Sequence, residues 1–157
     1  MALHFRATTC MPCVASERIF AKNWRPSTYY GHDMESSVAV REKYMNYVEQ
    51  AMEEAKKSPM AQKHGCVIVH KNKLVSAGYN KLVEPFGSYS VHAEVNALLK
   101  AKKILTKSEL KQSKLFIVRI GTDNMDNPLK YSKPCKVCQE LIDRLGIKIV
   151  FYSTSEM

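Results

Sequence analysis

Two short stretches decide what this 157-residue chain can be: His92-Ala93-Glu94 and Pro134-Cys135-Lys136-Val137-Cys138. Each stands at the start of a segment with helical periodicity, and 43 positions (135 − 92) separate their first metal-type side chains. Two cysteines three apart at a helix start point the same way, so both thiolates can reach one metal ion. Pro134 suits a helix start, where its missing N–H removes no hydrogen bond. The positive end of the helix dipole there favours thiolates over thiols.

The chain around these stretches alternates helical and strand patterns. Strand-sized apolar segments lie at 65–70, 74–79, 115–120 and 147–152, and the turn residues 71–73 join the first two into a predicted β-hairpin. Helices are predicted at about 37–57, 92–103 and 135–145, the last ending at Gly146. The order is α-β-β-α-β-α-β, with the spacing of a parallel crossover in the second half. It predicts an α/β fold of three layers, α/β/α, with a mixed central sheet of four to five strands.

Composition indicates one globular domain behind an extension. Hydrophobic residues make up 45% and charged residues 25% of the chain, as in ordinary globular proteins. We divide it into an irregular extension, residues 1–35, and one domain, residues 36–157. No apolar run approaches the roughly 20 residues that span a bilayer, so we expect no membrane segment. Five cysteines without a secretory signal indicate reduced thiols. We expect a cytoplasmic protein, with an organelle transit peptide as the weaker alternative.

The net charge of +9, from 24 Lys and Arg against 15 Asp and Glu, suits an anionic ligand such as a nucleotide or a nucleic acid. It fits a basic solvated surface equally well. Three cations lie near enough to the predicted pocket to meet a phosphate, although each is more often a solvated residue: Lys81, Arg119 and Lys133.

The two stretches are weak signals apart and a strong one together. An isolated His-x-Glu is usually a solvated or capping pair, and an isolated Cys-x-x-Cys can be two buried thiols, a redox pair or half a structural zinc site. One imidazole nitrogen and two sulfurs suit zinc, and three protein ligands leave a fourth position for water. A structural zinc would need a fourth protein ligand, for which His64 and Cys66 are the nearby candidates.

A catalytic zinc ion explains the acidic residue as well. Bound zinc lowers the pKa of water from about 15.7 towards about 7. Glu94, two residues after His92, is then in position to carry the proton as a general acid–base group. We therefore predict one catalytic Zn²⁺ ion.

The pattern H-x-E…P-C-x-x-C resembles the signature of the zinc-dependent nucleobase deaminases. From about residue 38 to 153 the chain resembles the cytidine/deoxycytidylate deaminase superfamily. The resemblance implies that His92, Cys135 and Cys138 bind zinc. It also implies that Glu94 protonates the ring nitrogen while hydroxide attacks the amine-bearing carbon and ammonia leaves. The substrate contacts that it implies are Asn80, Cys66 and Ala93.

For two of these residues a purely structural role is an alternative to substrate contact. Asn80 can instead be a turn residue that closes the hairpin. Cys66, on a buried strand, can simply pack.

The deoxycytidylate-type branch resembles the chain most. Riboflavin-pathway deaminases place more residues between their two cysteines, and guanine and tRNA-adenosine deaminases often carry Glu where this chain has Lys133. The stretch His92–Ala97, with Asn96, looks like the deoxycytidylate branch. The resemblance therefore favours a cytosine-type nucleoside or nucleotide as a small-molecule substrate.

Two alternatives stay open. One is a deaminase of a base in a polynucleotide, tRNA adenosine or single-stranded cytosine, in which aromatic residues stack on the bases; the candidates, which can equally be pocket or core residues, are Tyr79, Phe86 and Tyr89. The other is a non-catalytic zinc module that binds nucleotides or partner proteins.

The two ends of the chain raise separate expectations. The chain stops at Met157, after the fourth predicted strand, where most members of the superfamily have another helix and usually a fifth strand. We expect an uncovered sheet edge to be closed by self-association into a homo-oligomer or by residues 1–35. In the extension, Cys10 and Cys13 form a second Cys-x-x-Cys that could share a structural zinc with His4 or His32, or be two free cysteines.

Overall fold

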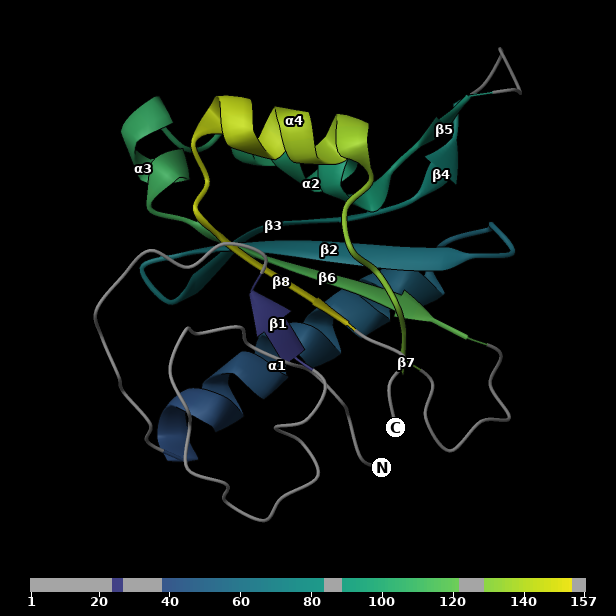
Figure 1. The fold of residues 1–157 in the computed structure, drawn as a ribbon, viewed down its shortest axis with the longest axis horizontal. Helices are drawn as coiled ribbons and strands as arrows, with labels where there is room; N and C mark the ends of the chain where they lie inside the picture. The colour runs from purple at the N-terminus through teal and green to yellow at the C-terminus, as the bar shows by residue number, and fades with distance from the viewer. Residues whose placement is uncertain (1–23, 27–37, 84–88, 122–128, 154–157) are drawn as a thin grey trace.

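The structure is a computed structural model that describes residues 24–26, 38–83, 89–121 and 129–153. Its centre is one mixed sheet (Figure 1). The strands of this sheet are β1 (Trp24–Pro26), β2 (Lys63–His70), β3 (Lys73–Tyr79), β6 (Lys114–Ile120), β7 (Leu129–Lys130) and β8 (Ile149–Ser153). The main path is β1-β8-β6-β2-β3, and the short β7 pairs with β6 beside it. Only the β6–β8 pair is parallel among the described pairs, and α4 forms the crossover between these two strands.

Helices cover both faces of the sheet (Figure 1). On one face lies α1 (Val38–Lys56); on the other lie α2 (Ala93–Ala101), α3 (Lys107–Lys111) and α4 (Lys136–Leu145). The predicted three-layer α/β/α fold is confirmed. The three predicted helices are present, and α3 is a short helix that the periodicity did not indicate. Among the described residues, no helix combines the length and apolarity needed to cross a membrane.

Two hairpin-like pairs precede the second helix. The predicted hairpin is confirmed as β2 and β3, which turn at Lys71 and Asn72, both in the left-handed region with φ of 47° and 63°. A second, unpredicted pair, β4 (Lys81–Leu82) with β5 (Ser90–Val91), forms a small ladder that projects beyond the main sheet (Figure 1).

The outer edge of β8 is covered by β1, which pairs with it antiparallel from Trp24 opposite Ser153 to Pro26 opposite Phe151. Coverage by residues 1–35, one of the two expectations for this edge, is therefore what the structure shows. Three residues ending in proline carry no strand signal, so this part of the extension was not recognised as a strand. The division at residue 35 stays a prediction. The second Cys-x-x-Cys with its histidines, and Phe86, lie outside the described residues.

Two hydrophobic layers flank the sheet because side chains alternate along its strands. Under α1 the layer is aromatic, with the rings of Phe116 and Phe151 stacked at 4.7 Å. Under α2 and α4 it is mostly aliphatic and includes Cys66 and the ring of Tyr152. Glycines bring a helix down onto each face: a Cβ on Gly65 would lie 1.9 Å from the Ala51 carbonyl oxygen of α1, and one on Gly78 would lie 2.6 Å from the Ala97 nitrogen of α2. The first contact fixes the height of α1 above β2, and the second fixes that of α2 above β3.

Candidate metal centre and active site

The predicted zinc ligands meet at the starts of α2 and α4. His92 Nδ1 lies 3.3 Å from Cys138 Sγ and 3.5 Å from Cys135 Sγ, and the three ligand atoms all lie within 4.8 Å of one another. Zinc bonds of about 2.0 Å to nitrogen and 2.3 Å to sulfur, at tetrahedral angles, would hold such atoms about 3.5–3.8 Å apart. The donor set and its spacing therefore fit one zinc ion.

The backbone explains why these side chains are available. His92 is the N-cap residue of α2 (φ −69°, ψ 155°) and Cys135 the N-cap residue of α4 (φ −68°, ψ 166°), yet neither side chain bonds to its own helix. Within the described residues, neither His64 nor Cys66 joins the ligand cluster. The ligand cluster of the described residues therefore has three members, which is the number of protein ligands in an open catalytic zinc site.

Glu94 is buried beside this cluster. Its side chain is 2% exposed, and no hydrogen-bond partner for Oε2 is found in the described part of the chain. Burial raises the pKa of the carboxyl group, against the opposing effects of its own backbone N–H and of His92. A buried carboxyl oxygen without a described partner is unusual in a folded protein and requires an explanation.

Cys138 is the buried cysteine of the cluster. Burial raises the pKa of the Cys138 thiol, and the charges of Glu94 and Cys135 raise it further. A thiolate in this position is unfavourable unless a positive charge compensates it, which a divalent ion held by the same sulfur would do.

Two of the predicted substrate contacts are buried near the ligand cluster. Cys66, on β2, and Ala93, the first residue of α2, are both 0% exposed and belong to the same hydrophobic cluster. Burial raises the pKa of the Cys66 thiol, with added contributions from Glu94 and Cys138, so the thiol is neutral at pH 7. The structure gives Cys66 the packing role; contact of either residue with substrate stays a prediction.

The side-chain amide of Asn80 forms hydrogen bonds with the backbone in this structure. Nδ2 donates to the carbonyl oxygen of Gln62 (2.7 Å), and the backbone N–H of His64 donates to Oδ1 (2.8 Å). Asn80 therefore closes the hairpin by joining the end of β3 to the start of β2. One N–H and one lone pair of the amide are left for a substrate.

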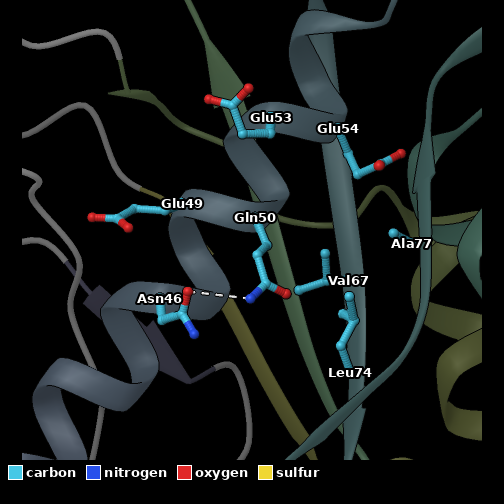
Figure 2. Close-up of a pocket in the computed structure, with 8 residues that line it drawn as sticks. All are labelled: Asn46, Glu49, Gln50, Glu53, Glu54, Val67, Leu74 and Ala77. Carbon is cyan, nitrogen blue, oxygen red and sulfur yellow. Dashed lines mark hydrogen bonds between the residues drawn. The ribbon is translucent and has the colours of Figure 1, made fainter.

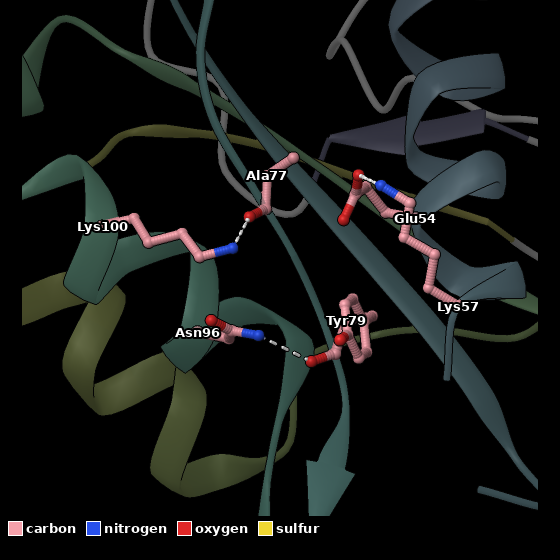
Figure 3. A network of polar contacts seen from close by, with 6 residues as sticks. All are labelled: Glu54, Lys57, Ala77, Tyr79, Asn96 and Lys100. Atoms are coloured by element: carbon pink, nitrogen blue, oxygen red, sulfur yellow. Dashed lines mark hydrogen bonds and ion pairs between the residues drawn. The ribbon is translucent and has the colours of Figure 1, made fainter. Parts of the chain in front are cut away.

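Side-chain bonds fasten α2 to β3 (Figure 3). Asn96 Nδ2 donates to the carbonyl oxygen of Tyr79 (3.0 Å), and Lys100 Nζ donates to that of Ala77 (2.7 Å). The separate ion pair in the same view joins Glu54 of α1 to Lys57, the residue after the helix. Asn96, which indicated the branch of the family, thus has a positioning role: it ties the helix that carries His92 to the sheet.

The approach to Cys135 is held by a buried hydroxyl pair that the sequence did not reveal. Ser132, 2% exposed, donates from Oγ to the Ile117 carbonyl oxygen (2.9 Å) and accepts from the backbone N–H of Ser153 (2.8 Å). Ser153 Oγ in turn donates to the Lys130 carbonyl oxygen (2.6 Å). These bonds fix the chain three residues before Cys135. A serine in a polar loop carries no signal of burial, so the sequence predicts only a loop there.

The predicted cations and aromatic residues are less tightly placed. Lys81 and Lys133 are exposed, and Arg119 is half-buried on β6. Tyr79 is half-buried on β3, and Tyr89 is 74% exposed next to β5.

A cavity of about 360 Å³ lies on the other face of the sheet (Figure 2). It is lined by residues of α1, β2 and β3: Asn46, Glu49, Gln50, Glu53, Glu54, Val67, Leu74 and Ala77. Its floor includes Val67, which packs in the α1 layer, and two of its carboxylates pair with Lys56 and Lys57. This hollow is separated by the sheet from the metal cluster and is not the candidate active site.

The family model of the cytidine and deoxycytidylate deaminase zinc-binding region matches residues 39–154. The chain belongs to this family. The match includes all three ligand candidates and Glu94, and the sequence-based resemblance to the superfamily is confirmed. No curated protein sequence matches the chain.

Solved structures of deaminases resemble the fold. The dCMP deaminase of cyanophage S-TIM5, in apo form, aligns with a TM-score of 0.53 and 23% identity over 68% of this chain and 79% of its own. The cytidine deaminase of Burkholderia pseudomallei aligns with a TM-score of 0.49 and 20% identity over 66% and 76%. The cyanophage enzyme in complex with dCMP and dUMP gives 0.48 and 21% over 72% and 79%. At these identities the likeness to the first structure shows the fold alone.

Proposed function

We propose that this family member is a zinc-dependent hydrolase that removes the amino group of a cytosine-type nucleoside or nucleotide, releasing ammonia. The observation that carries the proposal is the cluster of His92, Cys135 and Cys138 with the buried, unpartnered carboxyl group of Glu94 beside it. The ligands fit one zinc ion, and the adjacent carboxyl group fits proton transfer. A redox pair or a closed structural site would not explain the buried, unpartnered carboxyl group of Glu94.

The roles of the residues follow from their positions. His92, Cys135 and Cys138 would hold the ion, which would supply Lewis-acid activation of water. Glu94 takes a proton from the attacking water and delivers it to the ring nitrogen, and then assists departure of the amine as ammonia. The hydrolysis exchanges one C–N bond for one C=O bond and needs no oxidant or reductant. Burial raises the pKa of the Glu94 carboxyl group, which brings it closer to neutral pH and makes it a better proton carrier.

Support for cytosine as the base comes from the family and from two local features. The tight Cys135–Cys138 spacing and Lys133 before Pro134 both differ from what other branches carry. Family membership likewise supports the assignment of Asn80, Cys66 and Ala93 as the candidate substrate contacts.

The test is the Glu94→Gln variant assayed for ammonia release. We expect it to keep close to one zinc ion per chain and to lose about 10²- to 10⁴-fold in kcat, the usual contribution of general acid–base catalysis. Glu140→Gln, an exposed change on α4, is the matched control and should keep full activity.

Substrates for the assay are deoxycytidine, dCMP, cytidine, a short oligo-dC and an RNA hairpin with a target adenosine. Turnover of the monomers alone supports the proposal, whereas turnover of a polynucleotide alone would replace it with base editing. Wild-type protein that holds zinc and deaminates none of these would be a non-catalytic zinc module.

A further inference from the structure

The cavity of Figure 2, which we call the acidic hollow, combines an apolar floor with an acidic wall. Three glutamates of α1 line it, and its lining residues include neither lysine nor arginine. Two of these carboxylates pair with lysines at or just after the end of α1, whereas the exposed Glu49 pairs with no cation in the described part of the chain. On the floor, Leu74 of β3 is 46% exposed. The acidic hollow therefore suits an apolar side chain that is flanked by positive charge.

Gln50 gives an independent sign that the acidic hollow takes an occupant. Its Nε2 donates to Asn46 Oδ1 (3.2 Å), but its Oε1 is buried and has no hydrogen-bond partner among the described residues. Figure 2 shows this amide group pointing from α1 towards Val67 on the floor. A buried acceptor without a donor is unfavourable and rare in native proteins. A donor that arrives with an occupant would satisfy it.

The chain carries a surface of the complementary character between α2 and α3. Residues 102–107 join these helices and include the first residue of α3; we call them the basic turn. Ile104, in the middle of the basic turn, is 63% exposed. It is flanked by three exposed lysines, Lys102, Lys103 and Lys107, and none of the ion pairs in the described part of the chain includes one of them. The nearby carboxylate of Glu109 is bonded in the cap of α3.

The basic turn holds Ile104 in a fixed position. The backbone N–H groups of Ile104 and Leu105 both donate to the Ala101 carbonyl oxygen (2.9 and 2.8 Å), and the capping box of Thr106 follows directly. Leu105 packs against the layer under α2 and α4, which leaves Ile104 as the side chain that the turn presents outwards. A side chain held in this way loses little conformational entropy when it is bound.

We propose that the basic turn of one copy of this chain docks in the acidic hollow of a second copy. Ile104 would lie on the apolar floor beside Leu74, with the flanking lysines facing the glutamates of α1. The two surfaces lie on opposite faces of the sheet (Figure 1), so the contact is head-to-tail and leaves one free hollow and one free turn at the ends of each pair. Such contacts build rings or chains. The interface is separate from the metal cluster and does not depend on the proposed deaminase function.

The experiment is sedimentation velocity on the full chain from about 10 µM to about 1 mM, the range in which a small interface associates. We expect the mean mass of the wild type to rise with concentration at about 0.05 M salt and to rise less at about 0.5 M, because salt screens the exposed charges. Ile104→Ser, which keeps every charge, should weaken association about 10-fold through lost apolar contact. Thermal melting confirms that each variant is folded.

Charge reversal tests each surface separately. The turn variant (Lys102→Glu with Lys103→Glu) and the hollow variant (Glu49→Lys with Glu53→Lys) should each weaken self-association at least about 10-fold, because like charges then face each other. The controls make the same changes of charge at exposed positions elsewhere and should associate as the wild type does: Lys81→Glu with Lys133→Glu, and Glu140→Lys with Asp143→Lys.

Mixing the turn variant with the hollow variant is the decisive measurement. The intact hollow of the first meets the intact turn of the second, so the mixture should associate although neither variant does so alone. Both variants keep a positive net charge, so general attraction between opposite charges cannot produce this result. A wild type that is monomeric at about 1 mM would overturn the proposal. So would association that survives either variant, that Ile104→Ser leaves unchanged, or that mixing does not restore.

Discussion

The start of α3 and the starts of α2 and α4 have the same backbone form and opposite uses. Thr106 caps α3 in a complete capping box, in which its side chain accepts from the Glu109 N–H and the Glu109 side chain accepts from the Thr106 N–H. His92 and Cys135 occupy the same extended N-cap conformation, but their side chains leave their helices uncapped and turn to each other. A side-chain cap is worth about 1 kcal/mol. The structure gives up that stability at the two helix starts where ligands are needed.

Packing holds α2 and α4 in place of caps. α2 lies against Gly78 and is bonded to β3 through Asn96. α4 ends at Gly146 in the left-handed conformation (φ 76°), and its start is fixed by the bonds of Ser132. Among the described helices, the start of α3 is stabilised by its own cap, and the starts of α2 and α4, which carry the predicted zinc ligands, are stabilised by contacts with the sheet.

The largest effect should come from removing a ligand. Cys138→Ala leaves one sulfur and one nitrogen, too few for a zinc site, so we expect zinc content near zero after dialysis and at least about 10³-fold lower ammonia release. The matched control is Cys66→Ala, a buried cysteine on β2 that lies outside the ligand cluster.

That control should keep zinc while losing some stability to the smaller side chain. Metal analysis of the two variants side by side measures this. Full zinc occupancy in Cys138→Ala would contradict the ligand assignment.

Next in size is the support of Cys135. Ser132→Ala leaves the Ser153 N–H without its acceptor, so the free energy of unfolding should fall by about 1–3 kcal/mol and zinc affinity by about 10- to 100-fold. Ser113→Ala is the comparison at α3: Ser113 is as deeply buried and donates one hydrogen bond, to the Glu109 carbonyl oxygen, but lies away from the ligands.

Urea unfolding and competition with a zinc chelator separate the two results. Ser113→Ala should lose stability alone. Equal zinc affinity in both variants would show that Ser132 serves the fold and not the metal centre.

Sequence reasoning predicted the three side chains that the structure brings together, because metal chemistry restricts residue types. Only a few kinds of side chain bind zinc, so the identity and spacing of His92 and the two cysteines indicate a zinc site. The layers and the β2–β3 hairpin followed from periodicity in the same way. Ser132 and β1 were missed because neither burial of a hydroxyl group nor a three-residue strand leaves a pattern along the chain. Such features depend on what the sheet brings together.

Asn80 and Asn96 show a second limit. Their identities indicated family and substrate, and the structure finds their amides bonded to backbone. From sequence alone, an asparagine near a pocket is compatible with two roles, because the same amide group can bond to the backbone of a loop or to a ligand. Only the geometry of its partners separates these roles.

His64, on β2, and Glu109, in the cap of α3, should contribute to the pH dependence of stability in different pH ranges. The pKa of His64 is lowered to about 4 from an ordinary 6.5, mainly by burial, so the unfolded chain binds a proton in this interval and the folded one does not. Stability must then fall as pH drops from 6.5 to 4, by roughly 1–2 kcal/mol after allowance for partial exposure. At α3 the capping bonds from Thr106 lower the pKa of Glu109, and that contribution is present above about pH 4.5 and lost only below it.

Urea unfolding between pH 7.5 and 4.5 tests this assignment. His64→Gln should show a shallower loss of stability than the wild type over that range, and Glu109→Gln should run parallel to the wild type until about pH 4.5. Parallel curves for His64→Gln would mean that the ring titrates normally.

The smallest effect tests the comparison itself. Thr106→Ala should lower the free energy of unfolding by about 1 kcal/mol whether or not zinc is bound, because α3 loses its cap. Cys135→Ser places a good capping residue on α4, so in zinc-free protein it should be neutral or add a few tenths of a kcal/mol. In excess zinc the wild type gains binding free energy that the variant lacks, and the order reverses. Melting curves of both variants and the wild type, recorded with chelator and with zinc, measure the direction of each stability change. A Cys135→Ser variant less stable than wild type without metal would mean that the thiol itself supports the helix start, and that α4 gives up nothing by carrying a ligand there.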